Sequence, residues 1–201
     1  MGIGEIFEGV SRRTGCAQGR KDTVEDIVEL AVEIAREGRE GRKIGTLFVI
    51  GSVEELLQHS RPLILDPLYG HPPEVLQVTR ADFRETVKEL AQLDGAFLVA
   101  DDGTFVSAGR FVEVDLGAPE NFLPGLGTRH AAGASISRST DAVAVVVSQS
   151  SVVRVFAQGK LRAEIIPELF LMSKQSLAVQ NPRIERHPEA GLTLAVAGDI
   201  G

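Results

Sequence analysis

The sequence predicts a single α/β domain with a central mixed β-sheet surrounded by α-helices. In the N-terminal half, segments with helical periodicity alternate with short apolar runs typical of buried strands. Hairpin patterns dominate later in the chain, so the sheet should combine parallel and antiparallel strands. The 201 residues, 43% of them hydrophobic, are enough to bury one sizeable core.

Each predicted helix begins at a residue that can cap it and carries apolar residues at helical spacing. The first is capped by Asp22 or Thr23 and ends near Glu37, just before two glycines. A brief second helix begins at Ser52. The third begins at Thr79 and turns an apolar face inward.

The predicted strands are short apolar or β-branched runs bounded by turn residues. The turn sequences Asp-Asp-Gly at 101–103 and Gln-Gly-Lys at 158–160 predict hairpins between the strands that flank them. Residues 142–147 read Ala-Val-Ala-Val-Val-Val, which predicts a fully buried strand. In chain order the predicted strands are 44–50, 61–65, 93–99, 104–107 with a continuation over 109–115, 141–148, 152–156 and 161–166.

The chain is expected to divide into an N-terminal lead-in over 1–20, one folded domain over 21–166 and a C-terminal extension over 167–201. The extension has a helical pattern near 169–177, whereas 192–196 shows no pattern that we could assign.

Composition argues against several classes of protein. A net charge of −7 gives no general attraction for polyanions, so we expect no nucleic-acid partner. No window approaches the roughly 20 apolar residues of a membrane span, and the first ten residues carry two glutamates instead of an export signal. The single cysteine, Cys16, cannot form an internal disulfide. We therefore expect a cytoplasmic protein.

The strongest functional signal is the stretch 125–137, Gly-Leu-Gly-Thr-Arg-His-Ala-Ala-Gly-Ala-Ser-Ile-Ser. Thr128 is expected to cap a helix that is approached through Gly127 and has Arg129 and His130 in its first turn. Backbone amides, a guanidinium and an imidazole would then meet at the positive end of the helix dipole, which favours a phosphate. The small residues that follow predict close packing of this helix against a sheet.

Polar residues at two strand ends are further candidates. Asp94 is an acid at the mouth of a predicted strand, and Gly95 allows a ligand to approach the backbone closely. Ser148 and Gln149 end the most buried strand, where α/β sheets present groups to ligands. Each pair also has an ordinary explanation, as a turn or as a strand leaving the core, and the residues alone leave both readings open.

Together these motifs resemble the diadenylate cyclase domain, which makes cyclic di-AMP from two ATP molecules. The resemblance covers roughly residues 24–164 and rests on Leu93-Asp94-Gly95-Ala96, on Gly127-Thr128-Arg129-His130, and on Ser137 with the strand that follows it. It implies a mixed seven-stranded sheet wrapped by helices, ATP as substrate, and a homodimer or higher homo-oligomer in which two sites face each other.

The resemblance also implies roles for individual residues. Asp94 would ligate a divalent metal ion (Mn²⁺, Mg²⁺ or Co²⁺) and help activate the ribose 3′-hydroxyl, while Gln149 would be the second metal ligand. The implied catalytic residues are Asp94, Arg129 and His130. The implied nucleotide-binding residues are Gly95, Ala96, Phe111, Gly127, Thr128, Arg129 and Ser148.

The sequence departs from the family pattern at two positions. Ala131 stands where the family continues with a second arginine, so one phosphate donor is missing. Gln149 stands where a glutamate often follows the serine, and an amide oxygen ligates a metal ion without contributing charge. A nucleotide-binding sensor without turnover is therefore an alternative to a cyclase. Another ATP-consuming transferase or hydrolase and a structural protein that binds no ATP are further alternatives.

Overall fold

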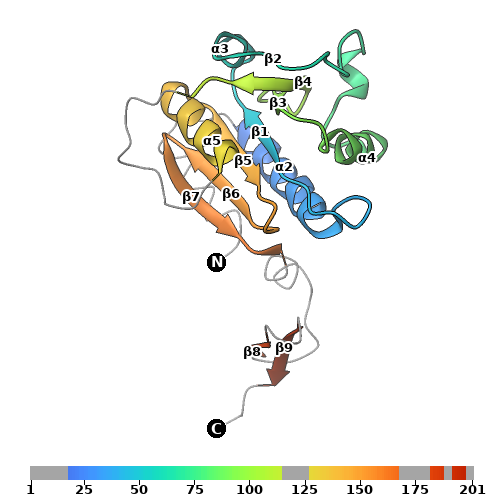
Figure 1. Cartoon of the computed structure of the whole chain (residues 1–201), viewed down its shortest axis with the longest axis vertical. Coiled ribbons are helices and arrows are strands. Elements are labelled where there is room, and N and C mark those ends of the chain that lie inside the picture. Colours follow the sequence, from blue (N-terminus) through green and yellow to red (C-terminus); the bar gives the residue numbers. More distant parts are fainter. Residues whose placement is uncertain (1–17, 115–126, 168–181, 188–191, 198–201) are drawn as a thin grey trace.

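The computed structural model describes residues 18–114, 127–167, 182–187 and 192–197. Its helices are α2 (Gln18–Glu37), α3 (Val53–Gln58), the 3₁₀ helix η1 (Pro73–Val75), α4 (Ala81–Leu90) and α5 (Thr128–Ser139). Its strands are β1 (Thr46–Ile50), β2 (Ser60–Pro62), β3 (Ala96–Val99), β4 (Phe105–Val112), β5 (Val143–Val147), β6 (Val153–Ala157), β7 (Lys160–Ile165), β8 (Pro182–His187) and β9 (Leu192–Ala197). Figure 1 shows their arrangement.

Seven strands form one mixed sheet in the order β2-β4-β3-β1-β5-β6-β7, while β8 and β9 pair in a separate two-stranded sheet. The central pair β1 and β3 is parallel, and the other neighbours in the large sheet are antiparallel. The structure therefore confirms the predicted α/β class, the mixed sheet and both hairpins.

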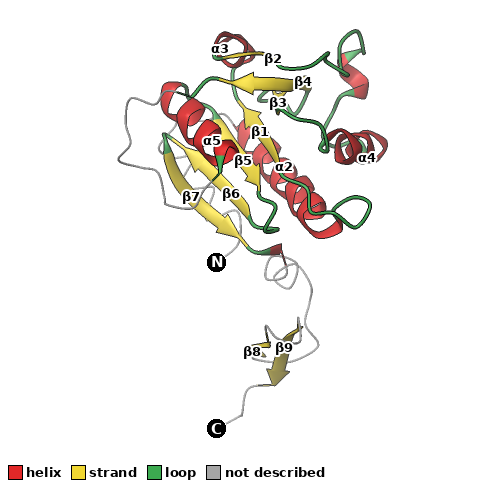
Figure 2. Cartoon of the chain, in the orientation of Figure 1, coloured by secondary structure: helices red, strands yellow, loops and turns green. Residues whose placement is uncertain are grey.

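Helices cover both faces of the large sheet (Figure 2). Phe48 and Ile50 of β1 point into the core that includes the apolar residues of α2 and α4. The alternating residues Leu47 and Val49 point into a second core with residues of α3 and α5. Because both faces are covered, β1, β3 and β5 are buried throughout, which explains why their sequences are continuous apolar runs.

Helix α5 lies close against the sheet, as its small residues predict. A Cβ atom added at Gly133 would lie 3.1 Å from Val146 Cγ2 and 3.3 Å from Ala144 Cβ. A larger side chain there would push the helix away from β5.

The first helix begins earlier than predicted. Helix α2 already includes Gln18, and Thr23 lies inside it instead of capping it. The Thr23 hydroxyl donates a hydrogen bond to the Asp101 carbonyl (2.8 Å), and Arg20 Nη2 donates to the Asp101 carboxylate (2.8 Å). These contacts with the β3–β4 turn hold the added helical turn. The predicted segment boundary near residue 20 stays a prediction.

Several other predicted bounds need correction. The strand predicted at 61–65 ends at Pro62, because the N–H groups of Leu63 and Ile64 both donate to the Gly109 carbonyl and bend the chain. Helix α4 begins at Ala81 with Arg80 as its N-cap, not at Thr79. Residues 192–196, which we could not assign, belong to β9. The helix expected near 169–177 lies outside the described residues.

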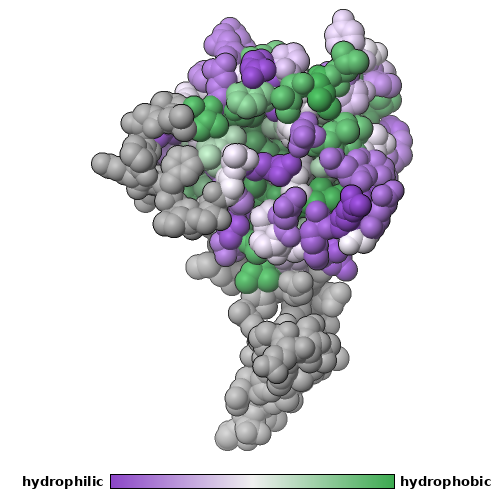
Figure 3. Space-filling view, in the orientation of Figure 1, coloured by the Kyte–Doolittle hydropathy of each residue, from purple (hydrophilic) through white to green (hydrophobic). Residues whose placement is uncertain are grey.

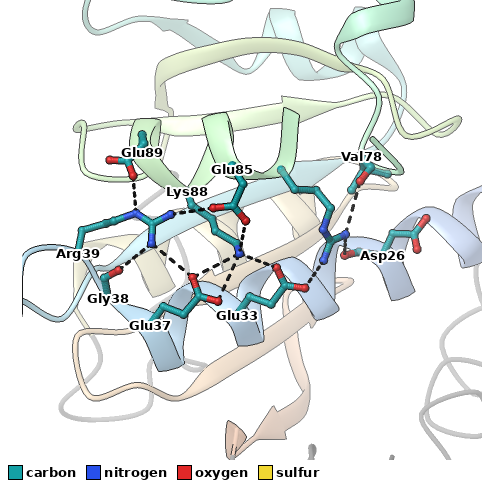
Figure 4. Close-up of polar contacts among 10 residues, drawn as sticks. Asp26, Glu33, Glu37, Gly38, Arg39, Val78, Glu85, Lys88 and Glu89 are labelled. Atoms are coloured by element: carbon teal, nitrogen blue, oxygen red, sulfur yellow. Dashed lines mark hydrogen bonds and ion pairs between the residues drawn. The ribbon is translucent and has the colours of Figure 1, made fainter. Parts of the chain in front are cut away.

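A cluster of charged side chains joins α2 to α4 (Figure 4). The Lys88 ammonium lies 3.0 Å from Glu33, 3.3 Å from Glu37 and 2.8 Å from Glu85. Burial alone would lower the pKa of Lys88, but the three carboxylates raise it overall. The cluster therefore holds a buried ammonium in its charged form.

We expect Lys88→Met to lower the free energy of unfolding by about 2 kcal/mol, because it leaves neighbouring carboxylates without their shared partner. Urea unfolding measures the difference. The control is Arg80→Ala, whose ion pair with Asp82 is exposed and should contribute little. A Lys88→Met protein as stable as the wild type would show that the cluster adds no net stability.

Within the described residues, no helix combines the length and the apolar character that crossing a bilayer requires.

Candidate functional site

The first turn of α5 is the point where the candidate residues meet. Gly127 is the N-cap of this helix, and the N–H groups of His130 and Ala131 donate to its carbonyl (3.0 and 3.3 Å). The prediction that Thr128 caps the helix is wrong, because Thr128 is the first helical residue. Its side chain therefore stays exposed at the helix terminus instead of being used as a cap.

One cavity, of about 450 Å³, opens between β3, β4 and the start of α5. Its walls combine apolar side chains with the acid and the guanidinium that the motifs predicted. The predicted site residues that line it are Asp94, Gly95, Ala96, Phe111, Thr128 and Arg129. The remaining lining residues include Leu47, Leu63, Val112 and Arg110. This mixture suits a ligand with a flat apolar part and a polar end.

A second cavity, of about 340 Å³, lies on the other side of the same helix terminus. The predicted site residues that line it are Gly127, Thr128, Arg129, His130, Ser148 and Gln149. Arg154 and Ser150 also line it. Because Thr128 and Arg129 line both cavities, the two cavities adjoin at the first turn of α5.

Arg129 links the two cavities. Its Nη2 lies 3.6 Å from Asp94 Oδ1, and this ion pair is weak because the carboxyl side chain is 83% exposed. Sequence reasoning missed Gly45, at the entry to β1, where an added Cβ would lie 3.1 Å from Arg129 Nη1 and 3.4 Å from Gln149 Cγ. Because Gly45 has no side chain, the Arg129 guanidinium has room beside it. Arg129 and Asp94 both remain accessible to a ligand.

Position 95 requires a glycine because the backbone of β4 lies directly against it. Its φ angle is +104°, and an added Cβ would lie 2.6 Å from the Gly109 carbonyl carbon and 2.7 Å from Arg110 N. The Asp94-Gly95 segment thus passes directly over the backbone of β4. This contact fixes where Asp94 leaves the sheet.

The two serines of the motifs have structural partners. The Ser148 hydroxyl shares a hydrogen bond with Ser150 Oγ (2.6 Å) in the β5–β6 turn. The Ser137 hydroxyl accepts a hydrogen bond from the Gly159 N–H (3.2 Å) and so anchors the β6–β7 turn to α5. Ser148 still lines the second cavity, whereas Ser137 lines neither of the two.

His130 is a buried imidazole that contacts Arg154 and Phe156. Arg154 Nη1 donates to its Nε2 (3.2 Å), and the ring meets Phe156 edge-on. A guanidinium only donates, so Nε2 must be the acceptor and Nδ1 carries the proton. Among the described residues Nδ1 has no hydrogen-bond partner. Burial, and then the charge of Arg154, lower the pKa of His130, so the ring is neutral at pH 7.

This lowered pKa predicts a pH dependence of stability. Since folding favours the neutral ring, the contribution of His130 is fully present above the ordinary histidine pKa of about 6.5 and is lost as the pH falls. We expect urea unfolding between pH 7.5 and pH 5 to show a steeper loss of stability for the wild type than for His130→Gln. Equal slopes would contradict the lowered pKa.

The two predicted metal ligands do not share a cavity. Asp94 lines the first and Gln149 the second, with Arg129 lining both. Among the described residues, no group of three or more His, Cys, Asp or Glu side chains could hold a metal ion. One carboxylate with one amide fits an ion that takes its other ligands from substrate phosphates and water, as Mg²⁺ commonly does.

A protein-family model matches more than half of the chain. The model described as DisA bacterial checkpoint controller nucleotide-binding, DAC, matches residues 33–161. This chain belongs to that family of nucleotide-binding domains.

Two curated relatives are each named diadenylate cyclase. The one from Methanocaldococcus jannaschii is 45% identical over 164 residues, which are 81% of this chain and 50% of that protein. The one from Haloferax volcanii is 38% identical over 163 residues, which are 77% of this chain and 57% of that protein. The chain thus spans about half the length of these relatives.

Solved structures share the fold at low identity. A hypothetical membrane spanning protein from Bacillus cereus superposes with a TM-score of 0.52 at 23% identity, covering 69% of this chain and 61% of that one. DacA from Staphylococcus aureus superposes with a TM-score of 0.50 at 20% identity, covering 79% of this chain and 97% of that one. Both comparisons support the α/β architecture with its central mixed sheet.

Proposed function

We propose that this protein is a diadenylate cyclase, which condenses two ATP molecules into cyclic di-AMP and releases two pyrophosphates. The observation that carries the proposal is the meeting of Asp94 and Arg129, 3.6 Å apart, where two cavities adjoin in a member of this family. The names of the two curated relatives support the same activity.

The reaction consists of two equivalent phosphoryl transfers. In each, the 3′-oxygen of one ATP forms a bond to the α-phosphorus of the other, the bond from that phosphorus to the β-phosphate bridging oxygen breaks, and pyrophosphate leaves with the electron pair. The Asp94 carboxylate would receive the 3′-hydroxyl proton or stabilise its loss. Arg129 and the α5 terminus would neutralise charge on the phosphates, because such chemistry depends mainly on positioning and electrostatics.

The two cavities would divide the ATP molecule between them. The nucleoside would lie in the first cavity against Gly95, Ala96 and Phe111, where apolar side chains are available. The triphosphate would lie in the second cavity, which contains the first turn of α5, His130, Ser148 and Gln149. No acidic side chain is among the described residues that line this second cavity.

A divalent ion would accompany the phosphates. Where the two cavities adjoin, Asp94 from the first and Gln149 from the second would supply protein oxygens to Mn²⁺, Mg²⁺ or Co²⁺, and the ion would reduce the negative charge of the phosphates. Removing the metal ion with excess chelator should therefore abolish the formation of cyclic di-AMP.

Two copies of the chain would face each other, because one site of this size holds one ATP and the attack requires a second. Exposed apolar side chains at and after Leu63 support such a contact: Leu63 lines the first cavity, Ile64 and Leu65 follow it, and Leu65 is 95% exposed. Figure 3 shows apolar side chains gathered along this edge of the molecule.

We assign catalysis to a domain over residues 21–166 of a cytoplasmic protein, with 167–201 as an extension.

Ala131 and Gln149 favour one alternative, a catalytically weak sensor of ATP or of a cyclic dinucleotide. Incubation with ATP and Mg²⁺, Mn²⁺ or Co²⁺, followed by mass-spectrometric product analysis, separates the proposals. A cyclic dinucleotide supports the cyclase. ATP binding without product supports the sensor, and AMP or ADP as product indicates another ATP-consuming enzyme.

We expect Arg129→Ala to weaken ATP binding by tenfold or more, since a hydrogen bond to a charged group contributes about 1.5–3 kcal/mol. Calorimetric titration with ATP measures the change. Arg162→Ala is the matched control, because Arg162 donates to the Ala157 carbonyl and to Gln158 and lines neither cavity. Unchanged affinity in Arg129→Ala would contradict the phosphate role.

A further inference from the structure

Arg154 on β6 is a largely buried guanidinium that the sequence motifs do not include. Val153 and Val155 point into the core shared with α2, whereas Phe156 points into the core shared with α5. Because strand residues alternate between faces, Arg154 lies on the same face as Phe156, beneath the first turn of α5. Its contact with His130 confirms this position.

The contacts of Arg154 leave part of its guanidinium unused. Nε donates to Glu164 Oε2 (2.8 Å) on the neighbouring strand β7, and Nη1 donates to His130 Nε2 (3.2 Å). Nη2 makes no hydrogen bond with the described residues. Yet the side chain is only 14% exposed, while Glu164, its one anionic partner among the described residues, is 46% exposed. Because a buried charge is unfavourable unless it is paired, the Arg154 guanidinium should bind further anionic or polar partners.

The surroundings of Arg154 are complementary to a polyanion. It lines the second cavity together with Arg129, and the described lining residues include two guanidiniums and no carboxylate. His130, 7% exposed, lines the same cavity and holds Arg154 beside it through Nε2 (3.2 Å). The positive end of α5 adds backbone N–H groups. Two guanidiniums and a helix terminus thus surround one cavity.

We propose that Arg154 binds the triphosphate of ATP in the second cavity and supplies the second guanidinium that Ala131 cannot. The chain would then keep two arginines at the phosphates, one from the α5 motif and one from β6. In the free protein Glu164 holds the Arg154 side chain in place, and phosphate oxygens bind the donors that remain. This inference rests on the proposed function, because it assigns a further residue to the same site.

The test compares Arg154→Met with Glu164→Gln by calorimetric titration with α,β-methylene ATP, which cannot release pyrophosphate. We expect Arg154→Met to weaken binding by tenfold or more. Glu164→Gln removes the competing carboxylate and should leave affinity unchanged or increase it. Arg154→Lys keeps the charge without the planar fork and should bind with intermediate affinity.

A purely structural ion pair predicts a different pattern. Similar losses of affinity in Arg154→Met and Glu164→Gln, or wild-type affinity in Arg154→Met, would overturn the role of Arg154. If Arg154→Met does not fold, Arg154→Lys decides: reduced affinity at an unchanged melting temperature supports the role, and unchanged affinity contradicts it.

Arg129→Ala separates this inference from the proposed function. If Arg129→Ala weakens binding and Arg154→Met does not, the role of Arg154 is wrong and the ATP site stands. If the wild-type protein does not bind the analogue at all, the proposed function fails together with the role of Arg154.

Discussion

Asp94→Asn is expected to lower the rate of cyclic di-AMP formation by at least about a hundredfold, the range in which a positioned acid–base group contributes. The substitution keeps the shape of the side chain and removes the charge that would assist loss of the 3′-proton and hold the metal ion. Because the Asp94 side chain is 83% exposed and its ion pair with Arg129 spans 3.6 Å, the fold should not depend on that charge.

The measurement is the initial rate of product formation, with urea unfolding of the same preparations. Asp141→Asn is the matched control, since Asp141 is also exposed but lines neither cavity. Equal rates for Asp94→Asn and the wild type would mean that the catalytic site lies elsewhere. A large loss of stability would instead give Asp94 a structural role.

Gly95→Ala is expected to lower the free energy of unfolding by about 2–5 kcal/mol, which combines backbone strain with overpacking. The φ angle of +104° is costly for alanine, and its Cβ would lie 2.6 Å from the Gly109 carbonyl carbon, where backbone cannot move aside as a side chain could. Any displacement of this segment would also move Asp94, so activity should fall with stability.

Gly41→Ala separates the two contributions to this loss. Gly41 also has a positive φ angle, +72°, but no atom lies within 4 Å of an added Cβ. We therefore expect a loss of about 1 kcal/mol, from backbone strain alone. Equal losses for Gly41→Ala and Gly95→Ala in urea unfolding would show that β4 accommodates the methyl group and that the close approach is unimportant.

Much of the fold could be predicted because its signals are local. The buried strands β1 and β5 are continuous apolar runs, and the β6–β7 hairpin follows from Gly159 in its turn. The errors arose where distant residues decide the backbone. Strand β2 ends early because the Gly109 carbonyl, far along the chain, accepts hydrogen bonds from Leu63 and Ile64. Helix α2 begins early because Asp101 holds its first turns.

The candidate site could be predicted where it consists of contiguous motifs. The structure brings the predicted neighbours Asp94 and Arg129 to the same cavity. Gly45 and Arg154 were missed because no local pattern marks them. A glycine before a strand is common, and the orientation of Arg154 depends on how β6 pairs with β5 and how α5 crosses above it. The roles of Gly45 and Arg154 at the site could be recognised only from the three-dimensional arrangement of the strands and α5.

The most direct test of the account is incubation of the protein with ATP and Mn²⁺, Mg²⁺ or Co²⁺, with product identified by mass and its rate measured over a protein dilution series. We predict cyclic di-AMP with two pyrophosphates per molecule, and a rate per protein that falls on dilution as facing copies separate. ATP binding without a cyclic dinucleotide under all three metals would contradict the central claim that this site joins two ATP molecules.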